Sequence, residues 1–185
     1  RILNGIASEE KTVIDLIEHL NKNEEDFPAN AFRMQFTTNH DENSWNGTVF
    51  ERLGDGAETF AVLTCLVPDM PLVYTGQEAG NTKRLSFFEK DPVEWKDYKL
   101  SDIYSKLFQL KKNNKALYNG DRGGELIFIT SSNRENILSF SRSSGKDKIL
   151  ALFNLSNKPT EFDLMGETLR DSYKNLFSGK LESFT

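Results

Sequence analysis

The chain has 185 residues, of which 37% are hydrophobic and 28% are charged, and 14 of them are Phe. This composition excludes an intrinsically disordered protein, because it offers enough apolar and aromatic surface for a packed core. The 23 Lys and Arg residues against 28 Asp and Glu residues give a formal net charge of −5. That charge has the wrong sign for bulk neutralisation of phosphates, so we expect no nucleic-acid partner.

Three further classes of feature are missing from the sequence. No apolar run reaches the roughly 18 residues that a membrane-spanning helix needs, so we expect no membrane partner. Cys65 is the single cysteine and lies in an apolar stretch, which leaves no internal disulfide and no cysteine-based metal cluster. We expect no metal and no other cofactor. The chain begins at Arg1 inside a passage whose pattern predicts structure, so we expect it to be part of a longer protein.

The first part of the sequence predicts a helix followed by a strand. Apolar residues at helical spacing between Val13 and Leu20 predict an amphipathic helix that Ser8 caps and that ends near residues 21–23. The alternation of apolar and polar residues over Phe32–Thr38 predicts a strand. The polar run at 39–42 follows directly, so it lies at the strand's carboxyl end.

The middle of the sequence repeats this order. The almost wholly apolar stretch Glu58–Val67 predicts a helix that must be covered on most sides. Pro71–Tyr74 reads as a short buried strand, and Thr75–Glu78 as the loop that leaves it. Ser101 is a predicted N-cap for the next helix, whose basic residues lie near its carboxyl end.

Beyond Gly120–Gly124 the pattern changes to short β runs separated by turn residues, and we place a domain boundary there. The alternation of helix and strand before it is typical of parallel βα units, and the later runs predict a small antiparallel domain. The predicted strands are Glu125–Thr130, Asn136–Ser141, Lys148–Leu155 and Thr160–Leu164.

The candidate functional residues lie at the carboxyl ends of the two predicted parallel strands, where βα folds collect reactive groups. His40 and Asp41 follow the first strand, and Gln77 follows the second. A His beside an Asp is also a common capping or loop pair, so both interpretations stay open from the residues alone. Trp45 either stacks on a sugar ring or fills the core. Glu42 and Glu78 either bind a ligand or are solvated carboxylates.

The run Phe36-Thr37-Thr38-Asn39-His40-Asp41 resembles the last conserved sequence region of the alpha-amylase family, the retaining glycoside hydrolases that act on alpha-linked glucans. The resemblance extends in order along nearly the whole chain. Segments similar to the family's eighth strand, the loop after it, the last barrel helix and the β-sandwich strands are Pro71–Glu78, Lys83–Arg84 with Phe88–Trp95, Leu107–Gly120, Ile137–Arg142 and Ile149–Ser156.

The resemblance implies an α/β fold, in which the last part of a (β/α)8 TIM barrel precedes a small all-β antiparallel sandwich domain. Residues 1–120 would supply the sixth helix with the seventh and eighth βα units. Residues 121–185 would form the C-terminal β domain, which looks truncated because the family's domain usually has one more strand after the 181–185 region.

The resemblance also implies roles for the candidate residues. Asp41 would be the acidic residue that stabilises the transition state by hydrogen bonds to sugar hydroxyls. His40 would contact the same sugar, and Asn39, Trp45 and Gln77 are further candidate substrate-binding residues on the same rim. The expected partner is an alpha-glucan or malto-oligosaccharide.

The segments that hold the family's nucleophile and acid/base residue would precede Arg1. Retaining hydrolysis needs both carboxyl groups, so we expect this chain alone to be inactive and the longer protein to be an alpha-amylase-like glycoside hydrolase. We also expect self-association through the open barrel face. Many relatives are exported and others are cytoplasmic, so the compartment is left open. The alternative function is a non-catalytic carbohydrate-binding or interaction module.

Overall fold

The computed structural model of the chain describes residues 2–28, 31–95, 98–165 and 172–183, apart from the side chains of residues 23–25. Most of the helices precede most of the strands. The α-helices are α1 Ile2–Ala7, α2 Val13–Asp26, α3 Val49–Leu53, α4 Ala57–Leu66 and α5 Ser101–Asn113. The π-helix is η1 Glu42–Asn46, and the 3₁₀ turns are η2 Gly54–Gly56, η3 Lys115–Leu117 and η4 Gly120–Arg122.

The strands are short except for one long hairpin. β1 Met34–Gln35 and β2 Met70–Pro71 belong to the helical part. The remaining strands are β3 Ile127–Phe128, β4 Thr130–Ser131, β5 Ile137–Ser144, β6 Asp147–Asn154, β7 Leu164–Met165, β8 Ser172–Lys174 and β9 Leu181–Ser183.

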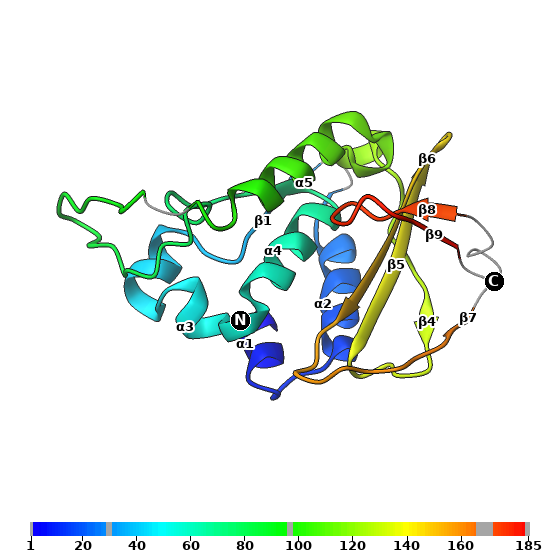
Figure 1. Ribbon diagram of the computed structural model, residues 1–185, viewed down its shortest axis with the longest axis horizontal. Coiled ribbons are helices and arrows are strands. Elements are labelled where there is room, and N and C mark those ends of the chain that lie inside the picture. The colour runs from blue at the N-terminus through cyan, green and yellow to red at the C-terminus, as the bar shows by residue number, and fades with distance from the viewer. Residues whose placement is uncertain (1, 29–30, 96–97, 166–171, 184–185) are drawn as a thin grey trace.

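The helices and the long β5–β6 hairpin lie side by side, with α5 running across the top of the view and the loop between β2 and α5 projecting to the left (Figure 1). One buried apolar cluster joins the two parts. It includes Leu16 of α2 and Leu63 of α4 together with Leu138 and Phe140 of β5. The strands after residue 120 therefore share a core with the helices before it.

The strands β1 and β2 pair in parallel, with Met34 opposite Met70 and Gln35 opposite Pro71. The Arg33 guanidinium reinforces the pairing, because its Nη2 lies 2.7 Å from Oδ2 of Asp69, whose residue is only 5% exposed. The predicted parallel arrangement is therefore present. The described residues show this single parallel pair, which is not in itself a barrel.

The residues after 120 form antiparallel sheets, as the sequence predicts. β5 and β6 pair along their full length, and β3 extends them to a three-stranded sheet in the order β3-β5-β6. β4 pairs with β7, and β8 pairs with β9. The small antiparallel C-terminal part is confirmed. Residues 166–171 and 184–185 lie outside the described chain, so the predicted ending of this domain is not assessed there.

Arg142 ties the antiparallel part to the helices from a position that is only 2% exposed. Its guanidinium donates to the carbonyl oxygens of Leu66 at the end of α4 (3.0 Å), Gly124 (2.9 Å) and Tyr118 (3.3 Å). A Cβ at Gly124 would lie 2.5 Å from the backbone of Ser143. The glycine at this position therefore allows the chain to pass against β5.

The beginning of α2 differs from the prediction. Ser8 does not cap this helix; its hydroxyl donates to the carbonyl oxygen of Gly5 in α1 (3.3 Å). The N-cap is Thr12, whose backbone N–H donates to Oδ2 of Asp15 (2.7 Å). Thr12 is favoured because Asp15 stands three residues later and completes the capping box. The helix also continues to Asp26, beyond the predicted end near residues 21–23.

The predicted first strand is shorter than its alternating pattern. Of the stretch Phe32–Thr38, only Met34–Gln35 pairs as a strand. The predicted buried strand Pro71–Tyr74 shares only Pro71 with β2, which is Met70–Pro71 and is not buried. The side of β1 away from β2 has no strand beside it among the described residues. Two apolar residues of the predicted stretch are open to solvent, with Phe32 54% and Met34 58% exposed. A segment forms a strand only over the length along which a neighbouring strand supplies backbone hydrogen bonds.

Two smaller expectations also change. α5 begins at Ser101, but its N-cap is Leu100 and not Ser101. The predicted strand Glu125–Thr130 is divided into β3 and β4, which pair with different partners.

Within the described residues, no helix is both long enough and apolar enough to cross a bilayer.

Candidate functional site

The candidate site begins at Asn39, beyond the carboxyl end of β1, which ends at Gln35. The Asn39 side chain caps the helical turn that starts at His40: its Oδ1 accepts from the backbone N–H of Glu42 (2.8 Å). This is the usual role of an Asn at a helix start. Because its side-chain oxygen is used by the protein, Asn39 acts on the site by positioning the two residues that follow it.

His40 and Asp41 both project into solvent from this turn. Their side chains are 64% and 59% exposed, and His40 Nε2 lies 3.5 Å from Asp41 Oδ2. The structure therefore brings these two predicted site residues together and leaves them free to contact a ligand. A carboxylate beside an imidazole can accept and donate hydrogen bonds to neighbouring hydroxyls of one polar molecule.

An aromatic cluster flanks this pair, and we call it the aromatic wall: Trp45 of η1 with Phe87 and Phe88 of the loop before α5. Phe87 lies at the centre, with its ring centroid 5.4 Å from that of Trp45 and 4.8 Å from that of Phe88. The His40 ring lies 5.6 Å from Phe87. Trp45 is 60% exposed, so it does not fill the core.

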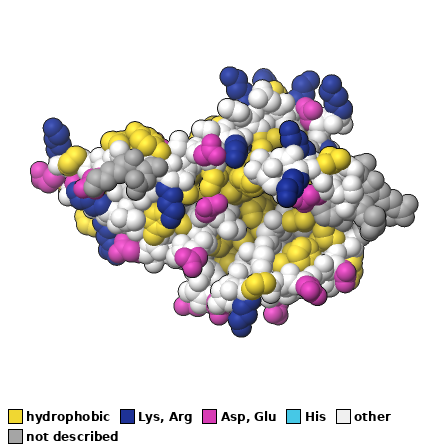
Figure 2. All heavy atoms as spheres, viewed as in Figure 1, with side chains coloured by type: hydrophobic (Ala, Val, Ile, Leu, Met, Phe, Trp, Pro, Cys, Tyr) yellow, Lys and Arg dark blue, Asp and Glu magenta, His cyan; other side chains and the backbone are white. Residues whose placement is uncertain are grey.

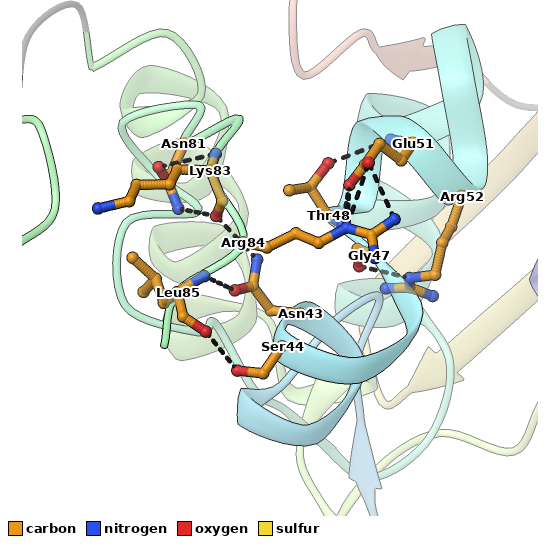
Figure 3. A network of polar contacts seen from close by, with 10 residues as sticks. All are labelled: Asn43, Ser44, Gly47, Thr48, Glu51, Arg52, Asn81, Lys83, Arg84 and Leu85. Carbon is orange, nitrogen blue, oxygen red and sulfur yellow. Dashed lines mark hydrogen bonds and ion pairs between the residues drawn. The ribbon is translucent and has the colours of Figure 1, made fainter. Parts of the chain in front are cut away.

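The loop that carries Phe87 and Phe88 is fastened to η1 through Asn43, which is 3% exposed (Figure 3). Asn43 Oδ1 accepts from the backbone N–H of Leu85 (2.7 Å), and its Nδ2 donates to the Lys83 carbonyl oxygen (3.3 Å). The Ser44 hydroxyl donates to the Leu85 carbonyl oxygen (2.7 Å). Leu85 itself is buried.

A second fastening joins Arg84 to α3 (Figure 3). Arg84 donates from Nε to Glu51 Oε2 (2.9 Å) and from Nη2 to Glu51 Oε1 (3.0 Å). Glu51 also accepts from the backbone N–H of Thr48 (2.7 Å) as part of a capping box. The Arg84 guanidinium, followed by the Thr48 N–H, lowers the pKa of the Glu51 carboxyl to about 2.

Gly47 makes room for this ion pair. Its φ is +115°, a value that L side chains rarely adopt, and a Cβ there would lie 3.1 Å from Arg84 Nη2 and 3.3 Å from Glu51 Oε2. Arg52 also stabilises the segment around Gly47. Its Nη2 donates to the Thr37 carbonyl oxygen (2.7 Å), and its Nε donates to the Gly47 carbonyl oxygen (3.0 Å).

Gln77 lies in the interior and is only 5% exposed. Its Nε2 donates to Thr37 Oγ1 (2.7 Å) and to the Tyr104 hydroxyl, while its Oε1 accepts from the backbone N–H of Tyr74 (3.2 Å). These bonds join the end of the β1 segment, the loop after β2 and α5. Direct contact with a sugar would require them to break, so in this structure Gln77 has a positioning role.

The structure also places residues that the sequence patterns did not single out. Phe87, and with it Asn43, is assigned no role by any local motif. The available signal was the adjacent pair of Phe residues in an otherwise polar loop. Glu42 is engaged by Arg52, with 3.5 Å between Oε2 and Nη1. Among the described residues, no group of three or more His, Cys, Asp or Glu side chains could hold a metal ion.

A separate hollow of about 880 Å³ lies between α4, α5, β6 and the β8–β9 hairpin, away from His40 and Asp41. Apolar side chains including Val62, Leu110 and Ile149 line it, with Lys146 and Glu182 among its polar residues. In the space-filling view, apolar side chains are visible in the depressions of this face (Figure 2). None of the candidate site residues lines this hollow.

Comparison with known proteins shows which proteins the chain is similar to. A family model described as the C-terminal domain of maltogenic amylase matches residues 126–182. Alpha-amylase 2 of Dictyoglomus thermophilum is 28% identical over 172 residues, which cover 85% of this chain and 28% of that protein. Alpha-amylase MalA of Haloarcula japonica is 26% identical over 148 residues, which cover 77% of this chain and 21% of that protein.

Solved structures show the same relationship at the level of the fold. A noncanonic maltogenic alpha-amylase, AmyB from Thermotoga neapolitana, superposes with a TM-score of 0.78 at 21% identity, covering 96% of this chain and 42% of that one. An alpha-amylase from Lactobacillus plantarum gives a TM-score of 0.73 at 20% identity, with 96% and 40% covered.

These findings confirm the resemblance: the chain is similar to the C-terminal part of alpha-amylase family proteins, and it shares the fold of two solved alpha-amylases. It spans only 28% and 21% of the length of the two curated relatives.

Proposed function

We propose that this chain supplies part of the substrate site of a retaining glycoside hydrolase that acts on alpha-glucans. The observation that carries the proposal is the position of His40 and Asp41, exposed and 3.5 Å apart in the turn beyond the carboxyl end of β1, which ends at Gln35 and pairs in parallel with β2. The carboxyl ends of parallel strands are where βα folds bind their ligands. The alpha-amylase relatives indicate the glucan class.

Asp41 acts on the sugar ring and not on the glycosidic bond. Its carboxylate accepts hydrogen bonds from two neighbouring hydroxyls of one glucose unit, and these bonds strengthen as the ring flattens toward an oxocarbenium ion. Such an interaction favours the transition state over the ground state. His40 donates to a hydroxyl of the same unit and fixes its orientation, while Asn39 holds both residues at the start of their helical turn.

In this proposal β1 and β2 are the seventh and eighth strands of a (β/α)8 barrel, residues 1–120 are its C-terminal part, and residues 121–185 are the β domain that follows. The parallel register of β1 and β2 supports this assignment. The short length of both strands also agrees with it, because in a barrel each strand pairs on both sides.

The chain alone is inactive under this proposal. Retaining hydrolysis uses two carboxyl groups about 5 Å apart, one as nucleophile and one as acid and base. The sugar-binding role of Asp41 fills neither position. The test is an assay for reducing-sugar release from soluble starch by the purified 185-residue chain. We expect no release, and release that scales with protein concentration would contradict the proposal.

The open side of β1 carries a further consequence. The edge of β1 away from β2 has no partner among the described strands, and Phe32 and Met34, before and in β1, are more than half exposed. An unpaired strand edge and exposed apolar side chains both promote association. We propose that the purified chain self-associates through this face. Light scattering across a wide concentration range should show a mass that rises with concentration, and a constant monomer mass would contradict it.

One observation favours the second candidate, a non-catalytic carbohydrate-binding module. Trp95 and Tyr98 stack with their ring centroids 6.2 Å apart, and they are 46% and 51% exposed. If the chain binds glucan through these rings, Trp95→Ala will remove the binding that Asp41→Asn leaves intact. The reverse result supports the catalytic-site proposal.

A further inference from the structure

Strand β6 has one edge without a partner among the described strands, because it lies at the end of the sheet order β3-β5-β6. The backbone of Ser139 in β5 points toward β3, since its carbonyl oxygen accepts from the Ile129 N–H (2.9 Å). In an antiparallel pair, the N–H and C=O of one residue point to the same side. Leu152 of β6 lies opposite Ser139, so it directs its own N–H and C=O away from β5, toward the open edge.

Leu150 has the same orientation, because the direction of the backbone groups alternates along a strand. Among the described residues, no hydrogen bond outside the β5–β6 ladder reaches the N–H or C=O of Leu150 or Leu152. The two residues lie about 7 Å apart along the strand. The edge therefore offers two donors and two acceptors at the repeat of a β-ladder, which is a template for another extended backbone.

The hollow of about 880 Å³ follows this edge. Its lining includes Ile149 and Phe153, which belong to the buried cluster that β6 shares with the helices. It also includes Leu150 and Leu152, whose side chains lie on the opposite face of the sheet because side chains alternate along a strand. A hollow that is lined from both faces of one strand lies along the strand's edge and not over a single face.

Two walls limit what can enter the hollow. One wall is helical and apolar, with Val62 and Leu66 of α4 and Leu110 of α5, and the other is the β8–β9 hairpin with Tyr173 (Figure 1). Lys148 Nζ lies 5.5 Å from the centroid of the Tyr173 ring, so this second wall lies close to the start of β6. The edge is recessed between the walls, where a single extended segment fits and the edge of a second folded sheet does not.

The charged groups around the hollow favour an acidic partner. Lys146, Lys148 and Lys174 line it, against the carboxylates of Glu58 in α4 and Glu182 in β9 among the described residues. This excess of basic groups is local, because the whole chain has a net charge of −5. An entering strand places alternate side chains on opposite sides. One set meets the apolar wall of α4 and α5, and the other set meets the side that carries the lysines.

We propose that β6 binds a single extended peptide from outside residues 1–185 as a fourth strand of the β3-β5-β6 sheet. The peptide backbone pairs with Leu150 and Leu152. Its apolar side chains pack against α4 and α5, and the acidic side chains that alternate with them face Lys146 and Lys174. In this mode of recognition, the main-chain hydrogen bonds supply affinity and the alternate side chains supply specificity. The site is separate from His40 and Asp41, neither of which lines the hollow.

The test uses a fluorescently labelled seven-residue peptide in which Val alternates with Glu, and it follows the anisotropy as the 185-residue chain is added. We expect saturable binding, with slower amide hydrogen exchange at Leu150 and Leu152 when the peptide is bound. The matched control is the same peptide N-methylated at its backbone nitrogens, which keeps the side chains and removes the donors. It should bind about tenfold more weakly. A peptide with Lys in place of Glu should also bind more weakly.

A pair of variants makes the same comparison on the protein. Leu152→Pro removes the outward N–H and no hydrogen bond to β5, and proline is tolerated on edge strands. Leu152→Ala keeps the N–H. We expect Leu152→Pro to weaken peptide binding about tenfold and Leu152→Ala to weaken it by no more than about threefold. Circular dichroism verifies the fold of both variants, and if the proline variant is unfolded, the two peptides decide on the wild-type chain.

Three results overturn the peptide site. The first is no binding of the unmodified peptide, and the second is equal binding of the unmodified and N-methylated peptides, which would mean that the hollow accepts apolar groups without strand pairing. The third is a mass that rises with concentration in light scattering for the wild-type chain and not for Leu152→Pro. In that case β6 pairs with a second copy of this chain.

Discussion

The guanidinium of Arg84 and the carboxylate of Glu51 form a two-pronged ion pair across 33 positions of sequence, with Nε 2.9 Å from Oε2 and Nη2 3.0 Å from Oε1. It joins the loop that carries Phe87 and Phe88 to the first turn of α3. The backbone N–H of Thr48 donates to the same carboxylate (2.7 Å). One side chain thus caps a helix and anchors the aromatic wall.

The Glu51 pair predicts a specific dependence of stability on pH. Its folded-state pKa of about 2 lies below its ordinary value of 4.5, so its contribution is fully present above pH 4.5 and is lost as the pH falls toward 2. We expect Glu51→Gln to lower the melting temperature at pH 6 by about 2–4 °C. The difference should vanish near pH 2. Thermal melts from pH 2 to 6, with Glu125→Gln as the exposed control, check this.

Among the substitutions considered, we expect the replacement of Arg142 to cause the largest loss of stability. Its guanidinium is buried and donates to three carbonyl oxygens from separate segments. Arg142→Met leaves these acceptors without their donor, and we expect the free energy of unfolding to fall by about 3 kcal/mol. Urea denaturation measures it. Arg134→Met, at an exposed position, should change the free energy little, and equal effects from the two substitutions would refute this role.

The buried hydrogen bonds of Gln77 lead us to predict that its substitution lowers the stability of the fold and does not only weaken ligand binding. Gln77→Leu removes the donor to Thr37 Oγ1 and the Tyr104 hydroxyl, and both of those residues are buried. We expect the free energy of unfolding to fall by about 2 kcal/mol. Gln109→Leu on the exposed side of α5 is the control. If Gln77→Leu leaves stability unchanged and weakens only sugar binding, Gln77 contacts the sugar directly.

The sequence predicted those elements whose local pattern agrees with their packing. The apolar stretch of α4 has eight buried residues, and two of the predicted β runs between turn residues form β5 and β6, a hairpin that pairs throughout. Ser8 was mistaken for a cap because it also precedes acidic residues, but only Thr12 has Asp15 at the third position after it. The lengths of β1 and β2 depend on neighbouring strands and not on their own residues.

The site was predictable in part for the same reason. His40 and Asp41 follow a strand, so their position at its carboxyl end could be read from their order. The contact between Phe87 and Trp45 could not, because Asn43 sets it by bonding to Leu85 across 42 positions. No local sequence pattern predicts such a hydrogen bond. The structural role of Gln77 likewise depends on Thr37 and Tyr104, which are distant in sequence.

The most direct test of the proposed sugar-binding role is the affinity of the 185-residue chain for maltotriose before and after the substitution Asp41→Asn. The amide keeps the size of the carboxylate and removes its charge, while Asp121→Asn makes the same change at an exposed position in η4. We predict at least a tenfold weaker affinity for Asp41→Asn, about 1.4 kcal/mol, and no change for Asp121→Asn. Equal affinity of wild type and Asp41→Asn would contradict the proposal.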